Sequence, residues 1–206
     1  MLFDLLAILS FLVVLLLLKR LVNIFPSLVA CLWRGKENIN LEASVKLAID
    51  RNIIAMAMIV PFCLTACRFR LYDPSFTEGM SENAYLGICF GVFVLYLLLR
   101  LIVLWLFRPK SMPKKTYGTA AKASYTFFAI LSLVLLAMGG ILAFIDVDVH
   151  VVRTAMLWVS AVIYALLLLR KLQIFTLSCS VFAAFLYLCA LEMIPTGILI
   201  VSALIF

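Results

Sequence analysis

A chain of 206 residues that is 67% hydrophobic and only 13% charged has too little polar surface to coat a water-soluble domain of its size. The composition excludes a soluble globular fold and indicates that a lipid bilayer surrounds most of the chain. The net charge of +7 does not indicate nucleic-acid binding, because the basic residues stand in short clusters between apolar runs and form no basic face with interleaved aromatic side chains.

The first apolar run, residues 2–18, is predicted to be an uncleaved membrane span. It lacks a basic start and a small-residue cleavage site, and its positive charges follow the apolar residues, unlike those of a secretory signal peptide. The next segment, residues 21–33, is apolar but contains Asn23 and Pro26. It is either an interfacial or re-entrant segment or part of a longer, broken first helix.

Residues 40–51 predict a short amphipathic helix, which either lies on the inner leaflet or is a solvated linker. One helical face is apolar and another is charged: Leu41, Val45 and Ile49 on the first, Glu42, Lys46 and Asp50 on the second.

Five further runs are long enough to cross a bilayer core of about 30 Å, which requires about 20 residues in a helix. In the first of them, two arginines lie near one end and can reach the head groups, although Pro61 interrupts the run. The predicted fold is therefore all-α: a single integral membrane domain, residues 1–206, built as a compact bundle of six transmembrane helices plus the short interfacial helix. The five spans are residues 53–72, 84–107, 122–145, 151–170 and 178–204.

The distribution of charge predicts that both ends of the chain lie outside, because lysine and arginine collect in cytoplasmic segments. Thirteen basic residues then lie inside and three lie outside, while most acidic residues lie outside. The inside residues are Lys19, Arg20, Arg34, Lys36, Lys46, Arg51, Arg108, Lys110, Lys114, Lys115, Lys122, Arg170 and Lys171, with the acids Glu37, Glu42 and Asp50; the outside residues are Arg68, Arg70 and Arg153, with Asp4, Asp73, Glu78, Glu82, Asp146 and Asp148.

Two loops are candidates for contacts beyond the chain. The outer loop, residues 68–83, is either a docking site for a partner or an ordinary capped loop. The inner loop, residues 108–118, is basic and contains two prolines, so it either contacts anionic lipid head groups or only fixes the topology. The docking candidates in the outer loop are Arg68, Arg70, Tyr72 and Asp73.

Gly87 and Gly91 form a G-x-x-x-G motif in the third span, which allows helices to approach closely. We interpret it as a helix-packing feature and assign no ligand to it.

Neither the cysteines nor the histidine predict a metal or another cofactor. No C-x-x-C pair occurs, and His150 has only Asp146 and Asp148 near it in the sequence, so the ligand supply for zinc or haem is poor. Cys67 and Cys89 are a conceivable disulfide on the oxidising side, whereas the simpler interpretation is that the cysteines are small buried hydrophobes.

Glu192 lies near the middle of the last predicted span and is the main candidate for an intramembrane polar site. A carboxylate at this depth usually faces a bundle interior or a wet cavity, and it binds a proton unless a cation lies nearby. Arg100 is the other charge well inside a predicted span, so a buried pair with Glu192 would lock two helices together. Pro195 leaves the carbonyl of Leu191 without its helical donor, which favours a kink.

The sequence 185–201, FLYLCALEMIPTGILIV, resembles the closing signature of a family of multi-spanning membrane proteins from Bacteroidota. The family is catalogued as a domain of unknown function, number forty-two seventy-one. The resemblance implies the inner membrane of a Gram-negative envelope and implies no activity. The matching positions are Leu186, Tyr187, Leu188, Cys189, Leu191, Glu192 and Pro195, and Ala190 departs from the hydroxyl residue expected there.

Two functions are consistent with these features. The first is a non-catalytic subunit or assembly factor of an envelope complex, whose partners are the bilayer and another membrane protein or a second copy of the chain. The second is a small proton-coupled transporter or channel module centred on Glu192. An enzyme is not expected, because none of the common catalytic or nucleotide-binding motifs occurs.

Overall fold

The computed structural model describes residues 2–77, 79–106, 113–145 and 148–205, and these residues form helices and no strand. Glu78, residues 108–112 and Asp146, which the sequence placed in loops, and residue 107, the predicted end of the third span, lie outside the described part of the chain. In chain order the elements are α1 (Leu2–Trp33), α2 (Gly35–Ala43), α3 (Val45–Ala57), α4 (Ile59–Arg68), the 3-10 turn η1 (Ser75–Thr77), α5 (Glu82–Leu106), α6 (Lys114–Phe144), α7 (Val149–Thr176), α8 (Val181–Leu188), the π-helical turn η2 (Cys189–Met193) and α9 (Ile194–Ile205).

Six helical stretches of the described chain are long and apolar enough to cross a membrane, which confirms the predicted all-α, six-span fold. Several spans extend further than hydropathy predicted, because a helix continues through polar residues where its apolar run ends. The fourth begins by Thr116, not 122, and the fifth ends at Thr176, not 170. The six stretches are Phe3–Trp33, Val45–Arg68, Glu82–Leu106, Thr116–Leu142, Val149–Thr176 and Val181–Ala203.

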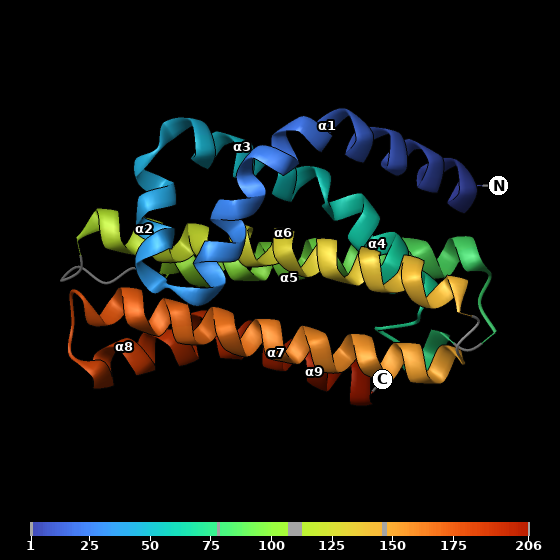
Figure 1. The fold of residues 1–206 in the computed structure, drawn as a ribbon. Coiled ribbons are helices and arrows are strands. Elements are labelled where there is room, and N and C mark those ends of the chain that lie inside the picture. The colour runs from blue at the N-terminus through green and yellow to red at the C-terminus, as the bar shows by residue number, and fades with distance from the viewer. Residues whose placement is uncertain (1, 78, 107–112, 146–147, 206) are drawn as a thin grey trace.

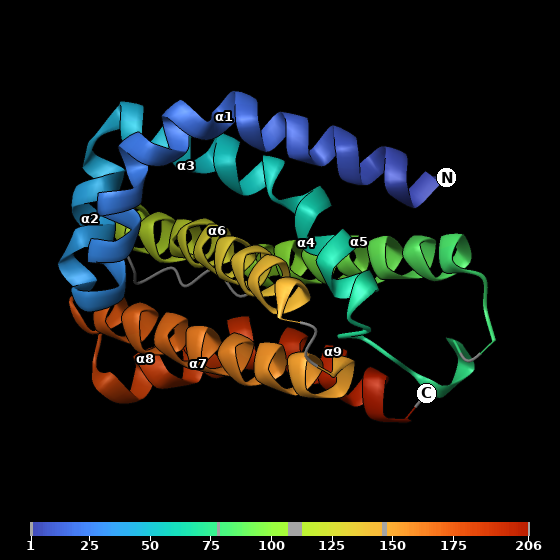
Figure 2. The same cartoon turned by 45° about the vertical axis from the view of Figure 1, so that its right-hand side comes forward.

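The long helices run side by side along the axis of the bundle (Figure 1). Helices α5, α6, α7 and the α8–α9 segment form one part, and α1, α3 and α4 pack beside it, as both views show (Figure 2). The two termini lie toward one end of the bundle and α2 lies at the other, as an even number of spans requires. We call the end that carries α2 the basic end, after Arg34, Lys36, Lys46, Arg51, Lys122 and Arg170.

Residues 21–33 continue the first span, as in the second of the two alternatives. They belong to α1, whose last part turns across the basic end of the bundle beside α2 (Figures 1 and 2). Pro26 lies in this part of the helix, where it lacks an N–H donor and its ring crowds the preceding turn. Ile24, Leu28 and Cys31 are buried, so the turned part closes the basic end of the core.

The predicted amphipathic helix over 40–51 is wrong in its bounds. Ser44 has an extended backbone (φ −91°, ψ 106°), so the short helix at the basic end is α2 and the chain enters its second span at Val45. The predicted faces also differ, because in a bilayer apolar side chains turn toward lipid, while Asp50, which is paired with Arg20, turns inward. Val45 and Ile49 are exposed, whereas Asp50 is buried.

The helix of the second span is interrupted close to Pro61, as the sequence predicted. Helix α3 ends at Ala57 and α4 begins at Ile59, with Met58 between them. The ring of Pro61 crowds the carbonyl four residues earlier, at Ala57, which accounts for a break at this point. The two halves still form one membrane-length segment, Val45–Arg68.

A network of ion pairs and hydrogen bonds holds the basic end together. Glu42 of α2 pairs with Arg51 of α3, whose side chain is 2% exposed (3.0 Å), and with Lys122 of α6. Arg170 of α7 donates to the carbonyl oxygens of Leu32 (2.6 Å) and Trp33 (2.9 Å), the last residues of α1. These contacts join α3 and α6 to α2, and α7 to the end of α1.

Candidate functional site

Glu192 is carried by a π-helical turn in the last span. Eleven residues separate it from each end of Val181–Ala203 (192 − 181 and 203 − 192), so it lies at mid-depth, as predicted. The N–H of Ile194 donates to the carbonyl of Cys189, five residues earlier, and Pro195 follows directly. The expected irregularity next to Pro195 is thus a widened turn, a feature often found at functional positions in helices.

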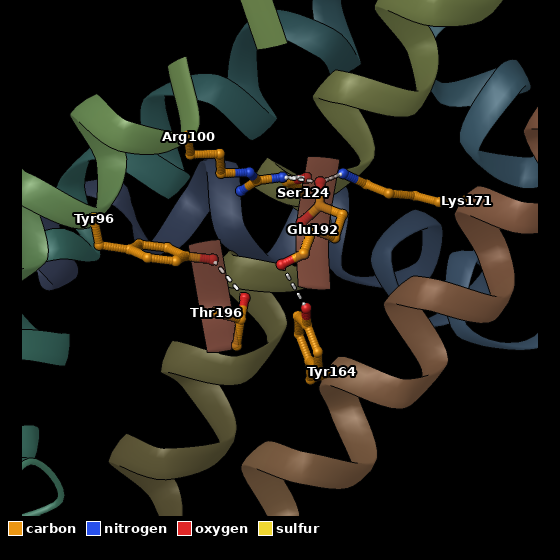
Figure 3. A network of polar contacts seen from close by, with 7 residues as sticks. All are labelled: Tyr96, Arg100, Ser124, Tyr164, Lys171, Glu192 and Thr196. Atoms are coloured by element: carbon orange, nitrogen blue, oxygen red, sulfur yellow. Dashed lines mark hydrogen bonds and ion pairs between the residues drawn. The ribbon is translucent and has the colours of Figure 1, made fainter. Parts of the chain in front are cut away.

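Two cations from different helices meet the same carboxylate oxygen (Figure 3). Nη2 of Arg100 on α5 lies 2.7 Å from Oε1 of Glu192, and Nζ of Lys171 on α7 also donates to this oxygen. Ser124 on α6 accepts a hydrogen bond from Arg100. Glu192 and Lys171 are each 2% exposed and the Arg100 side chain is 14% exposed. We call Arg100, Ser124, Lys171 and Glu192 the polar cluster.

Helix direction explains why these side chains converge. By helix rise, Arg100 and Lys171 start about 8–9 Å from the basic ends of their helices, whereas Glu192 starts about 16 Å from its own. Side chains lean toward the N-terminus of their helix. Helices α5 and α7 run toward the basic end, so the side chains of Arg100 and Lys171 lean away from that end, toward the middle of the membrane. The last span runs in the opposite direction, so Glu192 leans toward the basic end and meets the two cations.

The hydroxyl groups of Tyr96, Tyr164 and Thr196 lie on one side of the cluster (Figure 3). The Tyr164 hydroxyl on α7 donates to the backbone carbonyl of Glu192 (3.0 Å). The hydroxyls of Tyr96 on α5 and Thr196 on α9 lie 3.4 Å apart. These contacts join the last span to α7 through the backbone carbonyl of Glu192 and to α5 through the side chain of Thr196.

The cluster retains unused hydrogen-bonding capacity. Oε2 of Glu192 and Nε of Arg100 are buried and have no hydrogen-bond partner among the described residues. The cluster also carries two positive charges against one negative charge, a net charge of +1. A buried acceptor and a buried donor without partners are uncommon in native proteins and mark a place where polar chemistry remains possible.

The structure brings together some of the predicted polar-site residues and not others. Glu192 and Arg100 form the pair that the sequence suggested, and Pro195 adjoins it. Tyr187 does not belong to the site: it is half-buried against an apolar cluster that includes Ala120 and Ile174, and it makes no hydrogen bond within the described chain. Tyrosine at this position fills space between helices.

Sequence reasoning missed two residues of the cluster, Ser124 and Lys171. The Arg170–Lys171 pair was assigned to a cytoplasmic loop, because charges usually mark the end of a span. The sequence nevertheless contains a pattern that indicates the burial of Lys171. Lys171 continues the helical stripe of Ile163, Leu167 and Ile174, all of which are buried, at spacings of three and four residues.

The predicted docking loop is largely engaged within the chain. Asp73 pairs with Arg153 of α7 (3.1 Å) and with Arg70 (3.6 Å). The Tyr72 hydroxyl lies 3.2 Å from that of Ser202 on α9, and the Tyr72 carbonyl accepts from Tyr85 on α5. Of the four docking candidates, Arg68 is exposed at the end of α4 and forms no ion pair with another described residue.

The G-x-x-x-G motif does not bring α5 into close contact with another helix in the described part of the chain. Gly87 and Gly91 are exposed, and a Cβ added at either position would meet no heavy atom within 4 Å. The prediction of close packing is therefore wrong for contacts inside a single chain. Close approaches occur instead at Gly35 on α2, where an added Cβ would lie 2.5 Å from Oε1 of Gln173 on α7, and at Gly139 on α6, where it would lie 3.0 Å from the Phe69 ring.

The cysteines form no disulfide in the structure. Cys67 and Cys89, the conceivable pair, are both buried free thiols in the same apolar cluster. Among the described residues no three His, Cys, Asp or Glu side chains gather as metal ligands. Asp148 instead caps α7 by accepting a hydrogen bond from the backbone N–H of His150 (3.2 Å).

One family model matches residues 5–202, almost the full chain, and it is described as a domain of unknown function (DUF4271). No curated protein and no solved structure matches this chain. The match agrees with the resemblance seen in residues 185–201, which contain Glu192 and Pro195.

Proposed function

We propose that this chain, which belongs to the DUF4271 family, is a non-catalytic subunit or assembly factor of a larger complex in the inner membrane of a Gram-negative cell. Its six membrane-length helices make it an integral, multi-pass membrane protein. In this proposal the basic end faces the cytoplasm and both termini face the periplasm, because lysine and arginine are enriched on the cytoplasmic side.

The observation that carries the proposal is the closure of the polar cluster. Glu192 and Lys171 are almost completely buried, and each is paired within the chain. The surface cavity between α1 and α3 and the one beside His150 and Trp158 are not lined by residues of the cluster. An enclosed ion pair that joins three helices supports a role in holding the helices together more than a role in solute transport.

A second feature indicates where a partner would bind. The face of α5 that carries Gly87 and Gly91 is exposed and unused by the helices of this chain. Without side chains at these positions, the backbone of another transmembrane helix can approach closely, which is the usual role of this motif in membranes. We define these two glycines as the α5 glycine face.

The experiment compares two sets of glycine substitutions. Gly87→Leu with Gly91→Leu fills the α5 glycine face, whereas Gly140→Leu changes an equally open helical glycine on α6. After solubilisation of native membranes in a mild detergent, the wild type and Gly140→Leu should migrate in blue-native electrophoresis as a complex of one defined mass. The double variant should migrate at the mass of the free chain.

A wild-type chain that is monomeric in every mild detergent tested would contradict this function. A double variant that remains in the same complex as the wild type would contradict the proposed contact, because it would show that the α5 glycine face does not contact the partner.

A proton-coupled module is the second candidate, and the buried, unpartnered Oε2 of Glu192 within a π-helical turn is the observation that favours it. In proteoliposomes that contain a pH-sensitive dye, the wild type would then carry a proton flux that Glu192→Gln, reconstituted at equal folded amount, would not. A wild type without flux, or a variant with the same flux, would eliminate this candidate.

A further inference from the structure

A cavity of about 630 Å³ opens between α1 and α3 at the basic end, away from both the polar cluster and the α5 glycine face. Its polar lining comes from two consecutive cations and an amide on α1 and from two charged residues at the start of α3. These residues are Lys19, Arg20 and Asn23 on α1 and Lys46 and Asp50 on α3.

The cavity is positively charged. Three cations face one carboxylate, which leaves a net charge of +2. Arg20 is held in place because its Nη1 lies 3.0 Å from Oδ1 of Asp50, yet its side chain is still 49% exposed, and a guanidinium has further N–H donors besides those on Nη1. Lys19 and Lys46 are exposed and form no ion pair with any described residue. The two lysines therefore have their full donor capacity available for an anion.

The cavity also has an apolar wall that continues into the lipid-facing surface. Val45 is 73% exposed and Ile49 is 51% exposed on the same stretch of α3. On α1, Leu15 and Leu16 precede the basic pair and are exposed as well. A soluble anion would gain nothing from this wall, whereas the acyl chains of a lipid would lie along it.

The depth of the cavity corresponds to the head-group region. Val45 is the first residue of the second membrane-length segment. Lys19 follows Phe3, the first residue of the first segment, by sixteen positions (19 − 3), which is about 24 Å of helix and close to the thickness of the hydrocarbon core. The cations of the cavity therefore lie where lipid phosphates lie.

We propose that this cavity binds the head group of an anionic glycerophospholipid, with the phosphate between Lys19, Lys46 and Arg20 and the acyl chains beside Val45 and Ile49. Its volume falls within the range of ordinary small-molecule sites. The site is independent of the proposed subunit role, since it uses neither the polar cluster nor the α5 glycine face.

The test is a titration of the purified full chain, in detergent, followed by native mass spectrometry. The probes are dioleoyl phosphatidylglycerol, dioleoyl phosphatidylcholine and sn-glycerol 3-phosphate. Lys19→Gln with Lys46→Gln removes the two free cations, and Arg34→Gln with Lys36→Gln is the control, because it removes the same charge from exposed positions at the same end.

The wild type should bind one phosphatidylglycerol saturably and in preference to phosphatidylcholine. The cavity variant should bind it about tenfold or more weakly, since each lysine near a membrane surface contributes on the order of 1 kcal/mol, and the control should bind it like the wild type. Equal binding of the two lipids, or an equal loss in both variants, would overturn the proposal. Saturation by glycerol phosphate at the affinity of the lipid would overturn it too, because the site would then hold a soluble anion.

Discussion

Nη2 of Arg100 lies 2.7 Å from Oε1 of Glu192, although 92 residues separate them in the chain. Lys171 reaches the same oxygen from a third helix, so one carboxylate holds two cations inside the membrane. The loss in the free energy of unfolding should depend on which of the three side chains is replaced, because each substitution leaves a different net charge buried in the cluster.

Glu192→Gln should destabilise the protein strongly. The amide cannot balance two buried cations, so we expect the free energy of unfolding to fall by about 3–5 kcal/mol, as when a buried ion pair is broken. Denaturant titration in a fixed detergent micelle would measure this change. Glu82→Gln, at an exposed carboxylate on α5, is the control and should be neutral. A Glu192→Gln protein as stable as its control would mean that the polar cluster does not stabilise the helix bundle.

Lys171→Met should be far milder. Methionine fills the volume of the lysine stem, and the remaining Arg100–Glu192 pair is electrically balanced, so the loss should stay within about 1 kcal/mol. The same titration measures it. The order of the two variants is the informative result: a Lys171→Met protein less stable than Glu192→Gln would show that the net charge of the cluster does not determine its stability.

At the basic end, Glu42→Gln should leave the buried Arg51 without its counter-ion. We expect a loss of about 2–3 kcal/mol, less than for a fully enclosed pair because the Glu42 side chain is 16% exposed. Glu37→Gln on the same helix is a matched control, since its carboxylate bonds only to Asn40 among the described residues. Thermal unfolding in nanodiscs would compare them, and equal midpoints would contradict the structural role of Glu42.

Gly139 and Gly140 on α6 allow a packed position to be compared with the open position next to it. A side chain at Gly139 would press on the Phe69 ring, whereas Gly140 faces open space. Gly139→Leu should therefore cost about 1–3 kcal/mol through overpacking, and Gly140→Leu should be neutral or slightly stabilising. Thermal unfolding again provides the measurement. If the two variants unfold alike, α4 and α6 do not pack as described.

The sequence predicted the membrane fold and the Arg100–Glu192 pair because both follow from simple rules on hydrophobic length and buried charge. It missed Lys171 because a charge near a helix end was assumed to mark the end of the span. It also misplaced the amphipathic helix, because an apolar stripe does not reveal whether it faces protein or lipid. Val45 and Ile49 face outward, and Asp50 beside Ile49 is buried.

The glycines show a second limit of sequence reasoning. The G-x-x-x-G spacing of Gly87 and Gly91 indicates a surface suited to close approach, but the motif does not specify which helix approaches. Gly139 lies in no such motif, yet an added Cβ there would lie 3.0 Å from the Phe69 ring. Tertiary packing, which depends on residues far apart in the chain, decides between these positions.

The central claim is that Glu192 is ionised and enclosed by Arg100 and Lys171. Dicyclohexylcarbodiimide, which enters membranes and couples to protonated carboxyl groups in apolar surroundings, tests this claim most directly when the labelled peptide is quantified by mass spectrometry. The account predicts no label on Glu192 in the wild type and clear labelling once Arg100→Leu and Lys171→Met remove both cations. Stoichiometric labelling of wild-type Glu192 would contradict it.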